Sequence, residues 1–165
     1  MLPLTAIIAL SFFFQTPDAT TPANAHAEYT VVGHGVQIYK CTTQTQAASP
    51  TFKWVFQSPE ATLFDTTSKQ PVGVHSAGPT WTWNDKSAVV GKLLQSQPSP
   101  NPDSIPWLLL EAHSTGEPGA LSSIKFVRRS NTQAGAAPAT GCDAQHQDNI
   151  IRVPYEATYT FYSAQ

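Results

Sequence analysis

Short stretches in which apolar and polar residues alternate run through this chain, and turn-forming residues separate them. Such alternation is the period of a half-buried β-strand. No segment of ten residues shows the 3.6-residue period of an amphipathic helix. The clearest stretch covers residues 155–162, where one face would carry Tyr155, Ala157, Tyr159 and Phe161. We therefore predict an all-β fold with little or no helix.

The other expected strands are short and numerous. The pattern places them at residues 36–41, 52–56, 61–65, 72–75, 81–83, 107–112, 124–128 and 150–153. Residues 87–95 fit either a strand or a short helix, and the adjacent pair Val89-Val90 favours the strand. Four prolines between residues 97 and 106 predict a surface loop, because each one fixes φ and removes a backbone donor. About eight to ten strands joined by turns indicate an antiparallel sandwich or barrel.

The N-terminus predicts export. Residues 4–14 form an apolar run that is too short to span a bilayer but suits the core of a secretory signal. Small residues follow and offer cleavage after Ala25 or after Ala27, and a cut near Ala19 is a third alternative. We expect residues 1–27 to be a signal peptide with a short leader. Residues 28–165 would then be a single β domain of a secreted or periplasmic protein without a membrane span.

Cys41 and Cys142 are the two cysteines of the chain. An even number of cysteines in an exported chain indicates a disulfide bond. The bond would close a loop of about 100 residues and tie the first strand to the region before the last strand. The alternative is a reactive or metal-binding thiol pair, but the C-x-x-C spacing typical of such pairs is absent.

Four blocks of the sequence resemble a known family. They are G-V-Q-I-Y-K-C at residues 35–41, V-G-V-H-S-A-G-P-T-W at 72–81, I-P-W-L-L-L at 105–110 and V-P-Y-E-A-T-Y-T-F-Y at 153–162. The family is an uncharacterised secreted domain of unknown function from bacteria and fungi, and some fungal members carry the label malate dehydrogenase. The resemblance implies one exported domain with matched cysteines and brings no activity. The dehydrogenase label lacks a physical basis here, because the chain has no G-x-G-x-x-G and no alternating βα pattern.

Residues 72–87 form the candidate functional region. Turn residues at 77–80 and 84–86 predict a hairpin with His75 on one arm and two indoles on the other. One residue separates the indoles, so they point the same way at a spacing of about 6 to 7 Å. If exposed, they would form a platform for a sugar ring or another flat ligand, and if buried they would belong to the core. The predicted binding residues are His75, Trp81, Trp83 and Asp85, with Trp107 as a weaker member.

Copper is the alternative with the most specific chemistry. Cleavage after Ala25 would make His26 the first residue, with its amine and imidazole free to bind metal. A second imidazole from His75 or His113 would complete a three-nitrogen site that suits Cu(II). Without that terminus the histidines show no metal-binding spacing, and the expected cofactor is none.

The sequence predicts a protein that binds a small ligand, a carbohydrate or a cell surface. The alternatives are an extracellular enzyme, copper-assisted or carbohydrate-active, and a structural protein of the envelope or wall. A serine nucleophile is not expected, because Ser76 and His75 are strand neighbours and face opposite sides. With 12% charged residues and a net charge of -2, the chain has no basic stripe for nucleic acid. The oligomeric state is left open.

Overall fold

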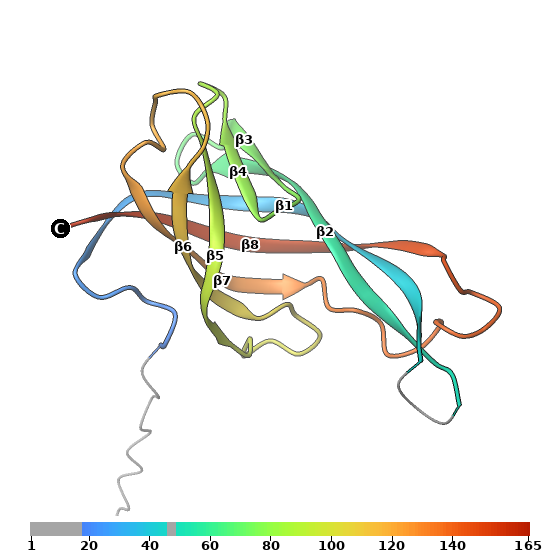
Figure 1. The fold of residues 1–165 in the computed structure, drawn as a ribbon. Coiled ribbons are helices and arrows are strands. Elements are labelled where there is room, and N and C mark those ends of the chain that lie inside the picture. Colours follow the sequence, from blue (N-terminus) through green and yellow to red (C-terminus); the bar gives the residue numbers. More distant parts are fainter. Residues whose placement is uncertain (1–17, 46–48) are drawn as a thin grey trace, which may run out of the picture.

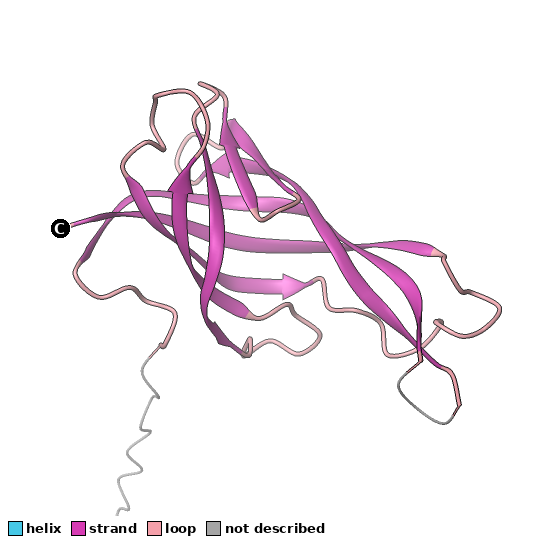
Figure 2. Ribbon diagram, in the orientation of Figure 1, coloured by secondary structure: helices cyan, strands magenta, loops and turns pink. Residues whose placement is uncertain are grey.

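The computed structural model of the protein describes residues 18–45 and 49–165. These residues form eight antiparallel strands and no helix (Figure 1 and Figure 2). In the part of the chain described, no helix is therefore long and apolar enough to cross a membrane. The strands are β1 (Ala25–Gln44), β2 (Thr51–Asp65), β3 (Pro71–Ser76), β4 (Thr80–Trp83), β5 (Ala88–Gln97), β6 (Trp107–Ser114), β7 (Ile124–Ala134) and β8 (Ile150–Ala164).

The strands close into an up-and-down barrel. Each strand pairs with the next one along the chain, and β8 pairs with β1 from Ala25↔Ala164 to Lys40↔Ile150. Closure satisfies the backbone donors and acceptors that an open sheet would leave at its edges. The all-β prediction is confirmed, and the barrel is the form that the chain takes. The ambiguous stretch at 87–95 lies in β5, and the proline-rich residues 98–106 form a loop.

The barrel interior follows the alternation of the strands. On β8 the predicted apolar face is buried as a whole, from Tyr155 to Phe161. On β1 the inward side chains include Gln37 and Tyr39, whereas Val36 and Ile38 are only partly buried on the other face. Alternation shows which residues share a face, but which of the two faces is buried depends on the strands that pack around it.

Gly33 lies where β1 meets the ring of Tyr159. A Cβ atom at position 33 would lie 2.6 Å from Tyr159 Cε2 in the packed interior. We expect Gly33→Ala to lower the free energy of unfolding by about 1 to 3 kcal/mol, because the ring has to move to make room. Urea unfolding measures this loss. His34→Ala, on the exposed face of the same strand, should cost less than about 1 kcal/mol. Equal costs for the two variants would contradict this account of the packing.

The two ends of the barrel differ. At one end the loop between β6 and β7 covers the interior with Leu121, which is fully buried. The amide of Leu121 donates to Ser87 Oγ (3.1 Å), and the amide of Ala120 donates to Asp85 Oδ2 (2.8 Å). The opposite end is formed by the β3–β4 turn, the 98–106 loop and the loop before β8. That end is open and contains a pocket.

A disulfide bond joins Cys41 to Cys142, with a Cα–Cα distance of 5.4 Å, and confirms the predicted pair. It fastens the loop before β8 to the end of β1. Two backbone hydrogen bonds also join this loop to β1. The amide of Cys41 donates to the carbonyl of Asn149, and the amide of Asp148 donates to the carbonyl of Cys41, each at 2.9 Å. The ends of β1 and β2 run beyond the body of the barrel as a two-stranded arm at this place (Figure 1).

Residues 18–24 pack against the outside of the barrel. Arg128 on β7 pairs with the carboxylate of Asp18 and donates from Nε to Thr20 Oγ1 at 3.1 Å. Thr20 is fully buried, and the amide of Ala19 donates to Gln97 Oε1 at 3.1 Å. A cut after Ala25 or Ala27 would remove these contacts. The apolar run at residues 4–14 lies outside the described residues, so the signal peptide stays a prediction.

Candidate functional site

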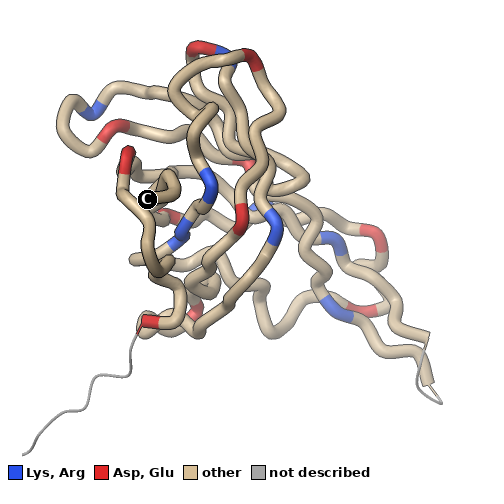
Figure 3. Tube along the Cα trace, turned by 60° about the vertical axis from the view of Figure 1, so that its left-hand side comes forward, with Lys and Arg blue, Asp and Glu red and all other residues tan. Residues whose placement is uncertain are grey.

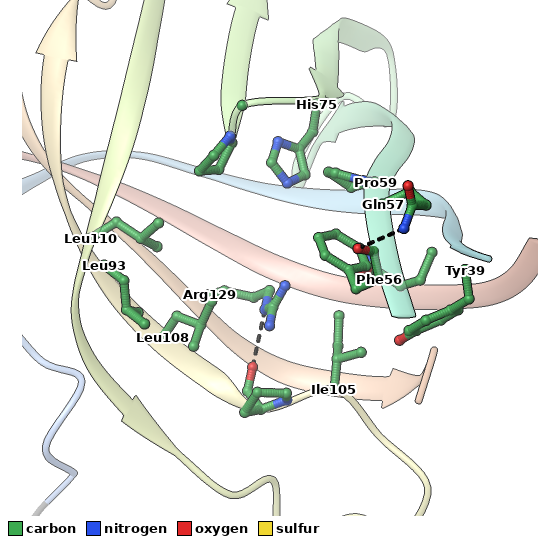
Figure 4. A pocket seen from close by; sticks show the side chains of 14 residues that line it. Tyr39, Phe56, Gln57, Pro59, His75, Leu93, Ile105, Leu108, Leu110 and Arg129 are labelled. Carbon is green, nitrogen blue, oxygen red and sulfur yellow. Dashed lines mark hydrogen bonds between the residues drawn. The ribbon is translucent and has the colours of Figure 1, made fainter. Parts of the chain in front are cut away.

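A pocket of about 570 Å³ opens at the barrel end formed by the β3–β4 turn and the 98–106 loop (Figure 4). An eight-stranded barrel is just wide enough to be filled by side chains or to hold one small ligand. The volume lies in the range of roughly 300 to 1,000 Å³ that is typical of small-molecule sites. The wall is largely apolar, with Phe56, Pro59, Pro79, Leu93, Ile105, Leu108 and Leu110.

The proline-rich loop forms one side of the pocket. Its prolines lack the backbone N–H that a β-ladder needs. The last residues of the loop are nevertheless hydrogen-bonded to β7. The amide of Ile105 donates to the carbonyl of Ala134 (3.0 Å), and Thr132 Oγ1 donates to the carbonyl of Ile105 (2.6 Å). Ile105 is therefore buried as part of the wall, and the carbonyl of Pro106 is free to accept a side-chain hydrogen bond.

Arg129 brings a positive charge into this pocket. Its Nε donates to the carbonyl of Pro106 at 3.0 Å, and its side chain points into the same space as those of His75 and Phe56 (Figure 4). No Asp or Glu of the described chain forms a salt bridge with it. Its neighbour Arg128, on the outer face, pairs instead with Asp18. Elsewhere charged residues of both signs are scattered over strands and loops (Figure 3).

His75 is a neutral member of the pocket lining. Its ring stacks on Trp81, with centroids 4.3 Å apart and an interplanar angle of 7°. Its Nδ1 lies 2.9 Å from the carbonyl of Thr80. A carbonyl only accepts, so Nδ1 carries the proton and Nε2 is left as an acceptor. Burial lowers the pKa of His75 to about 4, and the ring is therefore uncharged at neutral pH.

Three tyrosines stand beside His75 and Arg129. The hydroxyls of Tyr155 and Tyr159 are 3.0 Å apart, and the Tyr39 hydroxyl donates to the carbonyl of Gly135 at 2.6 Å. Burial raises the pKa of all three phenols, so they stay protonated. Among the described lining residues, Arg129 is the one that carries a charge at neutral pH.

Gln37 adds an unsatisfied donor. Its side chain lines the pocket from β1 and is only 2% exposed. Its amide nitrogen Nε2 makes no hydrogen bond of good geometry among the described residues, and the hydroxyl of Tyr155 is a polar group beside it. A buried donor without a partner costs about 1 to 3 kcal/mol, and an acceptor placed in the pocket would recover that cost.

The five predicted binding residues are spread over the fold. His75 lines the pocket, and Trp81 lies behind it at 1% exposure, in the core rather than on an exposed platform. Trp83 packs against Phe161, with ring centroids 4.8 Å apart. Asp85 holds the loop at the closed end of the barrel. Trp107 is on the outer face of the sheet, where the Arg128 guanidinium lies 5.5 Å from its ring.

The three histidines considered for copper also lie apart. His26 is exposed at the start of β1 and pairs with Ser163, whereas His113 is exposed near the end of β6 and pairs with Val90. His75 is inside the barrel. Within residues 18–45 and 49–165 no three His, Cys, Asp or Glu side chains are grouped to hold a metal. The copper site was predicted for a chain that starts at His26 and stays a prediction for that chain.

Arg129 and Gln37 were missed by the sequence patterns for different reasons. The alternation at 124–128 groups position 129 with Lys125 and Val127, and the more apolar face is the one that carries Ile124 and Phe126. A bulge between Ile124 and Phe126 shifts the register, so that Val127 and Arg129 face inward. Gln37 lies in the expected strand 36–41, where the apolar residues Val36 and Ile38 share the other face. A polar residue in an otherwise regular strand was the signal that could have found it.

A comparison with protein families places the chain. The family model described as "Protein of unknown function (DUF3455)" matches residues 22–163. Neither the curated proteins nor the solved structures contain a match to the chain. The match begins just before β1 and covers all eight strands apart from the last residue of β8. The resemblance seen in the sequence is confirmed, and the protein belongs to this family, a domain of unknown function.

Proposed function

We propose that this protein binds one small, largely apolar molecule in the pocket at the open end of the barrel. The observation that carries the proposal is an apolar pocket of about 570 Å³ into which few polar groups converge. Its rim includes Phe56 and Leu93, whose side chains are 49% and 55% exposed. Burial of such side chains by a ligand would contribute about 25 cal/mol for each Å² of apolar area removed from water.

The proposal places the ligand away from the two indoles. Trp81 is covered by His75 and Tyr159, and a sugar ring has no access to its face. The proposal keeps the small-ligand part of the sequence-based prediction. Export remains part of it as well, and it is supported by the Cys41–Cys142 bond, because disulfides persist in oxidising compartments.

Binding of the neutral fluorescent probe N-phenyl-1-naphthylamine tests this proposal. We expect saturable binding to the wild-type protein and a loss of about tenfold or more for Leu93→Asp, because burying a leucine side chain contributes about 1.5 to 3 kcal/mol. Leu94→Asp is the matched control. Leu94 is the next residue on β5, is 44% exposed and does not line the pocket, so its variant should bind as the wild type does.

Thermal unfolding of both variants separates a binding defect from a folding defect. Each replacement is on an exposed position, and the two melting temperatures should agree within a few degrees. The proposal fails if the probe does not saturate the wild-type protein, or if the two variants bind it equally well.

A further inference from the structure

We infer that the ligand of this pocket is an amphipathic monocarboxylate, whose carboxylate is received by Arg129 and whose apolar body fills the rest of the pocket. The inference rests on the proposed function and names the class of ligand. Three features of the described lining support it: a guanidinium without a carboxylate partner, a buried amide donor without a hydrogen bond of good geometry, and the absence of any acidic side chain.

Arg129 has the geometry of a carboxylate receptor. The bond from its Nε to the carbonyl of Pro106 orients the planar group and leaves the terminal nitrogens without a carboxylate partner in the described chain. A guanidinium presents parallel N–H groups that match the two oxygens of a carboxylate. Other arginines of the fold use this capacity internally, since Arg128 pairs with Asp18 and Arg152 with Glu60.

Gln37 supplies a second donor to the same space. Its amide Nε2 makes no hydrogen bond of good geometry in the described structure, and the side chain is almost wholly buried within the lining. The side chains of Gln37, Ile105 and Tyr155 all lie against Gly135. A carboxylate that accepts from both Arg129 and Gln37 would therefore give these donors a stronger acceptor than the neutral hydroxyls of Tyr159 and Tyr155 beside them.

The charges around Arg129 favour one negative charge and no more. His75 is neutral and the nearby phenols are protonated, so no anion of the described lining competes for the guanidinium. The hydroxyl of Tyr159 lies beside Arg129 but is neutral, and a neutral oxygen is a weaker acceptor than a carboxylate. In apolar surroundings the attraction between opposite charges is less screened than in water. A dianion such as a phosphate monoester would bring a second charge for which the lining has no second cation. A cationic head group would be repelled.

Leucine side chains form the part of the pocket that would contact the apolar body of the ligand. Leu93, Leu108 and Leu110 lie together on one side of Arg129 (Figure 4). Leu93 is at the exposed rim, so a chain that starts at Arg129 can extend along these leucines towards solvent. An aliphatic chain of medium length therefore fits the direction and the chemistry of this wall.

Competition against the bound naphthylamine probe tests the inference. The competitors are dodecanoate, dodecan-1-ol and dodecylamine, which share one chain and differ in the head group. For the wild-type protein at pH 7.5 we expect dodecanoate to bind about tenfold or more tightly than dodecanol, and dodecylamine to bind most weakly. Arg129→Gln should remove the preference for dodecanoate, so that the variant binds dodecanoate and dodecanol about equally.

Arg128→Gln is the matched control. It removes the adjacent guanidinium, which faces the outside of the barrel and pairs with Asp18, and it should keep the preference for dodecanoate. Gln37→Leu is the second variant and should weaken dodecanoate several-fold more than dodecanol. The inference is overturned if wild-type protein binds dodecanoate and dodecanol equally, or if Arg129→Gln keeps the preference. In either case, saturable binding of the neutral probe to the wild-type protein would still support the proposed function of the pocket. An absence of saturable probe binding would contradict the proposed function as well.

Discussion

Replacing Cys41 and Cys142 together by serine is expected to lower the free energy of unfolding by about 2 to 5 kcal/mol. The two residues are 101 positions apart, so the bond restricts the unfolded chain from β1 to the loop before β8. For a loop of about 100 residues the chain-entropy account gives about 4.7 kcal/mol. In the folded barrel β1 and β8 are also joined along their length by the backbone ladder.

Urea unfolding followed by tryptophan fluorescence measures this effect. The midpoint should fall for the double variant, and wild-type protein treated with a reductant should give the same midpoint. Binding of the neutral probe at low urea should persist in the double variant, since neither cysteine lines the pocket. An unchanged midpoint would mean that the unfolded chain gains no freedom when the bond is removed, contrary to this argument.

Acidification from pH 6.5 to pH 4 is expected to destabilise the fold by about 3 kcal/mol through His75 alone. The usual pKa of 6.5 applies to the unfolded chain, and burial lowers it to about 4 in the folded barrel. In this window the unfolded chain binds a proton that the folded one does not, so falling pH favours unfolding. A difference of about 2.5 between the two pKa values, at about 1.36 kcal/mol each, gives about 3.4 kcal/mol over the whole titration, and about three-quarters of it falls between pH 6.5 and pH 4.

The physical origin of the effect is the surroundings of the ring. His75 is enclosed by Trp81 and Tyr159, and the charge of Arg129 further opposes a second positive charge. The hydrogen bond to the carbonyl of Thr80 acts in the opposite direction but is outweighed by burial.

His75→Phe isolates this contribution. The variant keeps an aromatic ring against Trp81 and has nothing to protonate, so it should lose about 2 to 3 kcal/mol less than wild type between pH 7 and pH 4. Asp65 and Asp143 have a lowered pKa, and acidification removes the stabilising contribution of such exposed carboxylates in both proteins. This part of the stability loss therefore cancels when the two proteins are compared. His113→Gln, which removes an exposed imidazole, should follow the wild-type protein. Parallel pH curves for wild type and His75→Phe would rule out a buried neutral imidazole.

Much of the fold was readable from the sequence, because alternation and turns are local properties. The face from Tyr155 to Phe161 was predicted and is buried, and the stretch at 87–95 is a strand. The cysteine pair followed from number and expected compartment, and the family followed from four sequence blocks. His75 was singled out by its place in the hairpin, and it lines the pocket.

The sequence left the closure of the sheet and the composition of the pocket undetermined. A barrel rather than a sandwich depends on pairing between β1 and β8, whose residues are more than 100 positions apart. The sequence left open whether the two indoles form an exposed platform or belong to the core, and the structure buries Trp81 under the stacked ring of His75. Such outcomes depend on which surfaces meet, and that information is not contained in any single strand.

The sequence by itself determined the class of fold, the strand pattern and the disulfide, since each follows from residue types and spacing along the chain. Only the tertiary structure brought together Gln37 from β1, His75 from β3 and Arg129 from β7. A single bulge in β7 decided that Arg129 faces the interior, because one extra residue in a strand exchanges its two faces. The candidate site is therefore a product of barrel closure and of that local irregularity.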